Sequence, residues 1–538
     1  MSSESRIWEI RPFGSMRGGR ESVIGLVPLN PTSPPTLPFS NFFFGWFGAI
    51  VPPSSPANHS PNMPIPILSV AQMREWEKAS WAAGRSEAEV IDKVGRAIAR
   101  RLDSLVRPGS RILFLAGKGH NGDDVRAARK HLGSEHVALL LDVINPEQDL
   151  EKFLKATGGE GCSWVVDGLF GIGLDRPLDA HWQKLIEAVN AAKRPILAID
   201  VPSGLNAATG CPEGAAIVAD ITLTVGAPKD GLLKAAQYVG RLEVLSDVGL
   251  VPNPFDTDLY WTTEIDFANA PPRRPVESNK GNFGHLAIFA GSFGYHGAAV
   301  LAAHGALRAR PGLVTIFPQE SVYVPVASQC QSIMVQPWRA GLPLPKSCSA
   351  LLFGPGLAGA EVADGFKEEM RTHWHKTPLP VIADASALDW LQPGPTPPGV
   401  IRVVTPHPGE AGRILGISAA SVQSDRVRAL REISRRLGDC FVVLKGHQTL
   451  VGRAGGKIFV NSSGNPYLAQ GGSGDLLAGF LAGWLAQPDC QSDPMTMIRY
   501  AVWQHGATAD ELSETERNWT IEDLSRHLGN AGKSRRVA

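Results

Sequence analysis

Residues 471–487 read GGSGDLLAGFLAGWLAQ, a glycine-rich turn that runs directly into an apolar helix of small residues. Glycine lets backbone N–H groups come close to an anion, and the start of a helix adds positive partial charge. The stretch therefore predicts a phosphate cradle at the start of a helix. Asp475 would repel a bound phosphate unless it accepts a proton from a reacting hydroxyl. The alternative is a plain turn that Asp475 caps.

Four loops upstream of this turn each follow a short apolar stretch that we expect to form a strand. They are residues 291–298 (GSFGYHGA), 354–357 (GPGL), 405–410 (TPHPGE) and 445–449 (KGHQT). Open parallel sheets bind their ligands beyond the carboxyl ends of the strands. We therefore expect these loops to meet the glycine turn at one edge of a single sheet.

Apolar strands alternate with helical patterns along most of the chain, which predicts the α/β class with parallel sheets. In the first half, strands are expected at 111–116, 137–141, 164–166, 196–199 and 221–225. In the second half, they are expected at 286–290, 313–317, 350–353, 381–383, 403–405 and 441–444. The length of 538 residues favours two domains. Prolines 252, 254, 271 and 272 place the boundary between about 250 and 270.

Residues 1–62 are rich in Pro, Ser, Gly and Asn and lack helical or strand periodicity, so we expect a disordered extension. Order is expected from Ser69, a plausible helix N-cap before a run of helix formers. No basic start followed by an apolar stretch and a cleavage site indicates a secretory signal.

Composition favours small-molecule chemistry in the cytoplasm. Lys plus Arg and Asp plus Glu both number 52, so no net charge attracts nucleic acid or an anionic membrane. The six cysteines include no CxxC pair, which argues against a zinc site or a disulfide framework. The apolar run at 41–51 is much shorter than the ~20 residues that a membrane-spanning helix needs.

A second set of glycine and aspartate motifs lies in the first half of the chain. Residues 117–124 (GKGHNGDD) follow the expected strand RILFLA and open a helix. Residues 167–177 (DGLFGIGLDRP), 200–204 (DVPSG) and 226–231 (GAPKDG) also follow apolar strands. A strand, glycine loop and helix can bind phosphate, but the same arrangement is also a common plain connection.

Taken in order, KGNFG, GSFGYHGA, GPGL, DASAL, TPHPGE, LKGHQT and GGSGD resemble the ADP- or ATP-dependent NAD(P)H-hydrate dehydratase family over about residues 255–530. The resemblance implies a ribokinase-like fold. It also implies that a nucleotide phosphoryl group activates the hydroxyl of the hydrated nicotinamide ring, and that loss of phosphate restores the ring. Asp475 is the implied base; the implied contacts to the damaged cofactor are Ala298, Gly356, His407 and Asp475, and those to the nucleotide are Lys445, Gly446, His447, Gln448, Thr449 and Gly474.

Mg²⁺ is expected in that half from the chemistry alone. A transferring phosphoryl group needs charge neutralisation, yet no acidic cluster in the sequence marks the ligands of the ion.

The motifs of the first half resemble the NAD(P)H-hydrate epimerase family over about residues 66–250, which implies a Rossmann-like three-layer domain fused to the dehydratase. The implied substrates are NADHX and NADPHX, whose two C6 epimers such an enzyme interconverts. The implied K⁺ ligands are Asn121, Asp167 and Ser203, and the implied cofactor contacts are His120, Asn121, Gly122, Asp123, Asp124, Gly171, Ile172, Gly173, Leu174, Asp175, Arg176, Pro177 and Asp200. Asp200 is the expected acid or base, although an aspartate could also cap the turn before Pro202.

The glycine loop departs from the family pattern NNGGDG at His120, Asp123 and Val125. Asp123 adds a negative charge where the backbone should approach phosphate, and Val125 restricts positive φ. The departures predict a slow or weakly binding epimerase.

Two rival hypotheses remain open from the sequence. A small-molecule kinase of the ribokinase class would use an equivalent cradle and base, and fold alone does not choose between them. Alternatively, the first half is a non-catalytic binding module beside an active dehydratase. We expect a homo-oligomer in either case.

Overall fold

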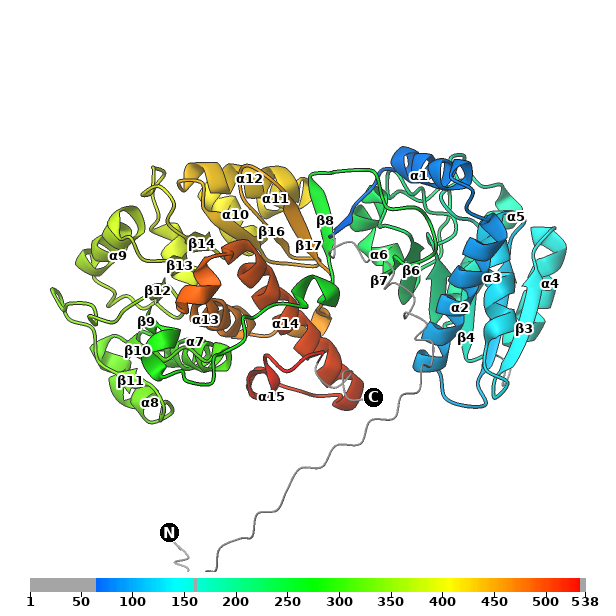
Figure 1. Cartoon of the computed structure of the whole chain (residues 1–538). Coiled ribbons are helices and arrows are strands. Elements are labelled where there is room, and N and C mark those ends of the chain that lie inside the picture. Colours follow the sequence, from blue (N-terminus) through cyan, green and yellow to red (C-terminus); the bar gives the residue numbers. More distant parts are fainter. Residues whose placement is uncertain (1–63, 159–161, 533–538) are drawn as a thin grey trace, which may run out of the picture. The chain divides into compact units, whose positions relative to one another are not determined.

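The computed structural model describes residues 64–158 and 162–532, which build two α/β domains (Figure 1). The N-terminal domain is built on a six-stranded sheet and the C-terminal domain on an eleven-stranded sheet. The extension expected to be disordered, 1–62, lies outside the described residues. Among the residues described, no helix has the length and apolar content that crossing a membrane requires.

The N-terminal sheet has the strand order β3-β2-β4-β5-β6-β7, and all neighbouring strands are parallel. The strands are β2 (Arg111–Ala116), β3 (Val137–Asp142), β4 (Trp164–Gly168), β5 (Ile196–Ile199), β6 (Ile221–Val225) and β7 (Arg241–Leu245). The helices are α1 (Val70–Ala82), α2 (Glu87–Leu105), α3 (His120–His131), α4 (Pro146–Thr157), α5 (Ala180–Ala191) and α6 (Ala236–Val239). Ser69 caps α1, as the sequence predicted.

Alternation along β2 explains the three layers of this domain. Ile112 and Phe114 pack with apolar residues of α2 and α3, whereas Leu113 and Leu115 pack with those of α4 and α5. Successive side chains of a strand point to opposite faces, so a fully apolar strand needs a helical layer on each side. The expected Rossmann-like, three-layer architecture is confirmed.

The C-terminal sheet has the order β1-β8-β17-β16-β15-β14-β13-β12-β9-β10-β11. The run from β15 to β11 is parallel, and β16 is antiparallel to both of its neighbours. The strands are β1 (Ile65–Pro66), β8 (Leu259–Thr262), β9 (His285–Phe289), β10 (Leu313–Phe317), β11 (Met334–Val335), β12 (Ala350–Phe353), β13 (Val381–Ala383), β14 (Arg402–Val404), β15 (Phe441–Leu444), β16 (Leu450–Gly452) and β17 (Ile458–Asn461). Pro66, expected to begin the first domain, pairs with Tyr260 of this sheet.

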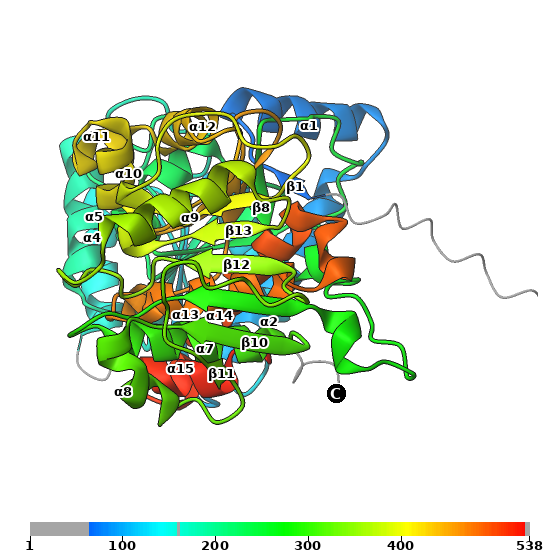
Figure 2. The ribbon, with the colours of Figure 1, turned by 90° about the vertical axis from the view of Figure 1, so that its left-hand side faces the viewer.

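Helices cover both faces of the C-terminal sheet (Figure 2). They are α7 (His296–Ala309), α8 (Tyr323–Ala327), α9 (Asp364–Lys376), α10 (Pro408–Leu415), α11 (Ala419–Ser424), α12 (Arg426–Arg436), α13 (Ser473–Leu485), α14 (Pro494–Thr515) and α15 (Ile521–His527). Residues of α9, α10 and α12 share one buried cluster with the sheet, and residues of α7, α13 and α14 share the other. Short 3₁₀ turns lie at Asp230–Lys234, Glu264–Phe267, Lys280–Phe283, Glu320–Val322, Ala385–Asp389, Pro466–Leu468 and Pro488–Gln491.

Small residues let α13 pack directly against α7. A Cβ added at Gly479 would lie 1.9 Å from the carbonyl oxygen of Ala302, and one added at Gly305 would lie 2.1 Å from that of Leu476. The helix of small residues noted in the sequence therefore fixes the start of α13, and with it the glycine turn, by close backbone contact.

Candidate active sites

The glycine turn forms the start of α13, as predicted. Gly472 precedes the helix with φ 92°, and no side chain caps the first turn. A Cβ at Gly472 would lie 2.3 Å from Leu301, so both conformation and space require glycine there. Asp475 lies in the first turn but does not cap it, which contradicts the alternative of a plain capped turn. In this first turn the Ser473 N–H donates to the Gln470 carbonyl oxygen at 3.4 Å and the Asp475 N–H faces its own carboxyl, so the N–H of Gly474 is the group best placed to receive an anion.

Asp475 lies near a lysine and two further carboxylates. Lys445 Nζ lies 2.9 Å from Asp384 Oδ1 and 3.9 Å from Glu410 Oε2. A Cβ at Gly474 would lie 3.2 Å from the same Nζ, so the lysine touches the cradle. The structure thus brings Lys445 and Gly474, both predicted nucleotide contacts, to the same place.

The electrostatics of this cluster suit proton transfer near neutral pH. Burial, and then the negative charge of Asp384 and Glu410, raise the pKa of Asp475 to about 7 although Lys445 opposes the shift. Burial alone would lower the pKa of Lys445, but the carboxylates of Asp384 and Glu410 outweigh it, so that pKa is raised. A base whose pKa lies near the working pH beside a permanent positive charge can serve phosphoryl transfer.

Asp384 and Glu410 were quoted in the motifs DASAL and TPHPGE, but no role was predicted for them. Asp384 is buried and accepts a hydrogen bond of 2.6 Å from Thr405 Oγ1. Among the described residues, the three carboxylates of this cluster do not come close enough together to form a metal-ligand group.

The predicted contacts to the damaged cofactor lie in two places. A Cβ at Gly356, whose φ is 64°, would lie 2.9 Å from Ala298 Cβ, so these two residues are neighbours. His407 is the N-cap of α10: its Nδ1 accepts from the backbone N–H of Gly409 at 3.0 Å. The ring remains half-exposed. His407 therefore fixes a turn and still leaves a ring edge open to solvent or a ligand.

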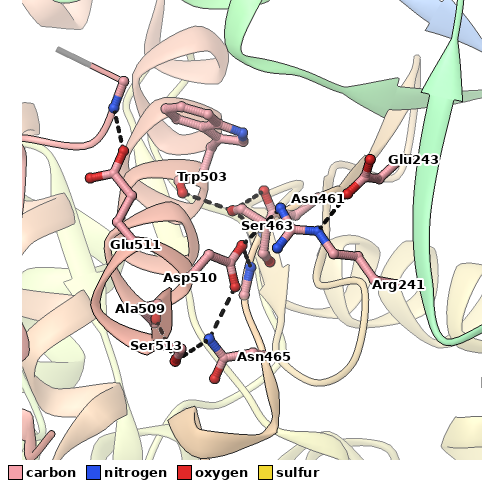
Figure 3. A network of polar contacts seen from close by, with 12 residues as sticks. Arg241, Glu243, Asn461, Ser463, Asn465, Trp503, Ala509, Asp510, Glu511 and Ser513 are labelled. Atoms are coloured by element: carbon pink, nitrogen blue, oxygen red, sulfur yellow. Dashed lines mark hydrogen bonds and ion pairs between the residues drawn. The ribbon is translucent and has the colours of Figure 1, made fainter. Parts of the chain in front are cut away.

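The segment that leads into the glycine turn is tied to α14 (Figure 3). Asp510 accepts from the backbone N–H of Gly464 and from Asn465 Nδ2, both at 3.0 Å. Ser463 Oγ donates to the carbonyl oxygen of Trp503 at 2.7 Å. Helix α14 thus holds the segment that connects β17 to the glycine turn.

The N-terminal domain contains a cavity of about 830 Å³. Its lining includes the predicted cofactor contacts His120, Asn121, Asp124, Gly171, Ile172, Gly173, Leu174, Asp175, Arg176, Pro177 and Asp200. Gly122 and Asp123, also predicted, do not line it. The sequence motifs of this half therefore do converge on one concave site.

The prediction that the loop departures weaken this site is not supported by the geometry. Asp123 Oδ1 pairs with Arg126 Nη1 at 2.9 Å, one helical turn further along α3, instead of facing the cavity. Val125 is fully buried inside α3, and its φ is not positive. The His120 ring is exposed, and its Nε2 lies 2.8 Å from Glu87. The helix begins at His120, which turns residue 123 outward.

Asp200 is held by a lysine that the sequence did not single out. Lys229 Nζ, on a side chain only 1% exposed, lies 2.5 Å from Asp200 Oδ1 and 3.0 Å from Thr224 Oγ1. Asp200 also accepts from the backbone N–H of Val225 at 3.3 Å. No contact of this carboxylate in the described structure caps the turn before Pro202, so the alternative role is not observed. Lys229 lies in the motif GAPKDG, and this position after an apolar strand was the only feature of the sequence that pointed to it.

Two further carboxyls line the same cavity. Burial, and then the charge of Asp200, raise the pKa of Glu77 and raise that of Asp124 well above its usual value. Asp200 has a lysine partner, whereas burial makes the charged forms of Glu77 and Asp124 less favourable. Carboxyls whose environments differ in this way can divide acid and base roles.

The three predicted K⁺ ligands meet around the backbone of Phe170. Ser203 Oγ donates to Asp167 Oδ1 at 2.6 Å, and the Phe170 N–H donates to Ser203 Oγ at 2.9 Å. Asn121 Nδ2 donates to the carbonyl oxygens of Phe170 and Ile199 at 2.8 and 3.0 Å. This fixes the amide orientation, because a flipped amide would set oxygen against two carbonyls.

The donor set fits a monovalent cation. Asn121 Oδ1 is buried and has no hydrogen-bond partner. Asp167 is fully buried, and burial raises the pKa of its carboxyl to about 6. A buried orphan oxygen beside a desolvated carboxyl is what a hard cation would satisfy.

Comparisons with known proteins agree for both halves. Residues 286–530 match the family model described as NAD(P)H-hydrate dehydratase, and residues 135–231 match the model of the YjeF-related protein N-terminus. A bifunctional NAD(P)H-hydrate repair enzyme of Coxiella burnetii is 30% identical over 486 residues, which cover 85% of this chain and 97% of the relative. The enzyme of that description from Escherichia coli is 31% identical, with 84% and 90% covered.

The solved structures that resemble the chain include an ADP/ATP-dependent NAD(P)H-hydrate dehydratase from Bacillus subtilis, co-crystallised with ATP and Mg²⁺. It is 32% identical, with a TM-score of 0.43, and the match covers 49% of this chain and 94% of that chain.

Proposed function

Because the chain belongs to the family of bifunctional NAD(P)H-hydrate repair enzymes, we propose that it returns hydrated NADH and NADPH to the reduced cofactors in two steps. The N-terminal domain interconverts the C6 epimers. The C-terminal domain dehydrates the S epimer at the expense of ADP or ATP. A cytoplasmic location and a homo-oligomeric state are part of the proposal.

The dehydration step rests on one observation above all, the position of Asp475 in the uncapped first turn of α13 with a pKa near neutrality. Asp475 takes the proton of the C6 hydroxyl as that oxygen attacks the terminal phosphorus of the nucleotide, and the bond from that phosphorus to the rest of the nucleotide breaks. AMP leaves when the donor is ADP, and ADP leaves when the donor is ATP. The cradle N–H groups and Lys445 stabilise the negative charge of the transferred group. Loss of a proton from C5 and departure of phosphate from C6 then restore the ring double bond.

Mg²⁺ would enter with the nucleotide and neutralise its phosphate charge. Mg²⁺ commonly binds through substrate phosphates and one or two carboxylates and keeps several waters. Asp384 and Glu410 are the nearby groups suited to that role, either directly or through water.

The epimerisation step uses the acid and base pattern of the N-terminal cavity. The hydroxyl-bearing C6 is bonded to the ring nitrogen, so loss of the hydroxyl proton to Asp200 can break the N1–C6 bond while a carboxylic acid protonates N1. Asp124 and Glu77 are the candidates for that acid. Closure on the opposite face of C6 gives the other epimer. K⁺ at Asn121, Asp167 and Ser203 would hold the adjoining loop in shape and add positive charge beside it.

Neither rival hypothesis has comparable support. A ribokinase-class kinase is disfavoured because relatives over most of the chain are repair enzymes. A non-catalytic N-terminal module would not need a cavity that pairs Asp200 with Lys229 and buries two further carboxyls.

The test gives purified protein the S epimer with ADP and follows the absorbance of the reduced nicotinamide. Asp475→Asn should abolish recovery but still bind ADP, whereas Asp489→Asn, an exposed aspartate beyond the far end of α13, should behave as the parent. Accumulation of a phosphorylated product without restored absorbance would instead identify a kinase.

A further inference from the structure

We propose that Arg426, the first residue of α12, is a positioning residue that holds the nucleotide loop 445–449 in its binding shape. The inference rests on the proposed function of that loop in the C-terminal domain. Arg426 lies about twenty residues upstream of the loop and belongs to none of the motifs that pointed to the site.

The guanidinium of Arg426 is directed at the backbone of the loop. Its Nη1 donates to the carbonyl oxygen of His447 at 2.5 Å and to that of Gln448 at 3.3 Å. Its Nη2 donates to the carbonyl oxygens of Leu444 and Lys445 at 3.0 and 3.4 Å. One planar fork therefore gathers four carbonyls from the end of β15 and through the loop, which a point charge could not do equally well.

The loop has a conformation that needs such support. Gly446 has φ 137° and Gln448 has φ 52°. A residue with a side chain seldom adopts the left-handed region, and it stays there only when surrounding contacts hold it. The other contacts from outside the loop are at its two ends: the Lys445 N–H donates to the Pro406 carbonyl oxygen at 2.8 Å, and the Thr449 carbonyl oxygen accepts from the Asn461 N–H at 2.9 Å. Arg426 is the group that contacts the carbonyls of His447 and Gln448 in the middle of the loop.

The charge of Arg426 has no carboxylate partner in the part of the chain that the structure describes. Its contacts there are carbonyl oxygens, its Nε is buried without a hydrogen bond, and burial lowers its pKa to about 10. The group remains positive at neutral pH. A partly buried cation that is not neutralised by protein raises the local potential for an anion, and the phosphates of a nucleotide are such anions.

Arg431 supplies a matched control on the same helix. It also donates to backbone carbonyls, those of Ala454 at 2.8 Å and Gly456 at 3.4 Å, and it pairs with Asp258 at 3.0 Å. Ala454 and Gly456 belong to the turn between β16 and β17, and Asp258 directly precedes β8, so none of these groups is part of residues 445–449. Arg431→Met therefore removes an arginine that also holds backbone carbonyls, but it removes no contact to the nucleotide loop.

The experiment compares the full-length parent with Arg426→Met, Arg426→Lys and Arg431→Met. ADP binding is measured by calorimetry, and KM is measured separately for nucleotide and for hydrated cofactor. Arg426→Met should raise the ADP Kd and the nucleotide KM about tenfold or more, the loss expected when the displaced loop no longer makes one charge-assisted hydrogen bond to the nucleotide. The KM for hydrated cofactor should change less than about twofold, because Arg426 contacts the nucleotide loop and none of the residues predicted to contact the hydrated cofactor. Arg426→Lys should fall between the parent and Arg426→Met, and Arg431→Met should match the parent.

Equal ADP affinity in the parent and a folded Arg426→Met would overturn the proposal. If Arg426→Met does not fold, Arg426→Lys provides the test. A raised ADP Kd with an unchanged hydrate KM then supports the positioning role of Arg426, and an ADP Kd equal to that of the parent refutes it. Equal rises in both KM values would show a general structural role and also overturn it. A parent that binds neither ADP nor ATP would contradict the proposed function itself, which separates the two failures.

Discussion

Replacing Asp475 with asparagine should stabilise the C-terminal domain at pH 8 while it nearly abolishes dehydration. In the folded protein the pKa of Asp475 is about 7, raised from 3.8 by burial first and by the charge of Asp384 second. The native state therefore holds the proton more tightly than the unfolded chain does. At pH 8 the fold must keep a buried carboxylate that water would solvate better.

The magnitude and its pH dependence follow from that shift. A difference of about three pKa units corresponds to at most about 4 kcal/mol of destabilisation above pH 7. The cost is absent below about pH 4, where both states are protonated, and it grows as pH rises from about 4 to 7. An asparagine carries no charge, so the advantage of the variant should be present at pH 8 and nearly absent at pH 4.

Thermal unfolding of the parent, Asp475→Asn and Asp489→Asn at pH 8 and pH 4 measures this difference. The variant at 475 should have the highest Tm at pH 8, and the three proteins should converge at pH 4. Its dehydration rate should fall by about 10²- to 10⁴-fold, the usual contribution of a general base. A Tm at pH 8 equal to or below that of the parent would refute the argument that Asp475 is kept in an unfavourable charged state.

Three further predictions concern pH, K⁺ and the glycine loop. Dehydration kcat/KM in the parent should rise about tenfold from pH 6 to pH 8 as Asp475 ionises, and a flat profile with chemistry rate-limiting would count against this base. Ser203→Ala removes the hydroxyl that joins Asp167 to the loop, so epimerisation should lose its stimulation by K⁺ over Na⁺, while unchanged stimulation would place the ion elsewhere. Asp123→Gly should not speed epimerisation, because Asp123 pairs with Arg126 outside the cavity; a clear gain in kcat/KM at low salt would show that its charge reaches the substrate.

Much of the fold follows from local sequence because the central strands are apolar throughout. The expected strands 111–116, 196–199, 221–225 and 313–317 match β2, β5, β6 and β10 residue for residue. The missed strands lie toward sheet edges or in antiparallel pairs. β7 (RLEVL) mixes charged and apolar residues, and β16 is three residues long, so neither has a pattern strong enough to identify it.

Site residues could be predicted where they belong to glycine and aspartate motifs. They could not be predicted where a long side chain contacts residues far away in the sequence. Asp475 and Lys445 followed from their place after a strand or before a helix. Lys229 and Arg426 reach their partners through tertiary contacts, across 29 and 21 residues of sequence. Local spacing carries no information on such contacts, and the outward turn of Asp123 likewise depends on where α3 begins.

The most direct test of the account gives the full-length protein the pure R epimer of hydrated NADH with ADP, Mg²⁺ and K⁺. The reduced-nicotinamide absorbance should recover completely, because the N-terminal domain supplies the S epimer that the C-terminal domain consumes. Asp200→Asn should block recovery from the R epimer beyond its spontaneous rate and leave recovery from the S epimer intact. If that variant recovers NADH from both epimers as fast as the parent does, the claim that one chain carries both activities at these two sites is contradicted.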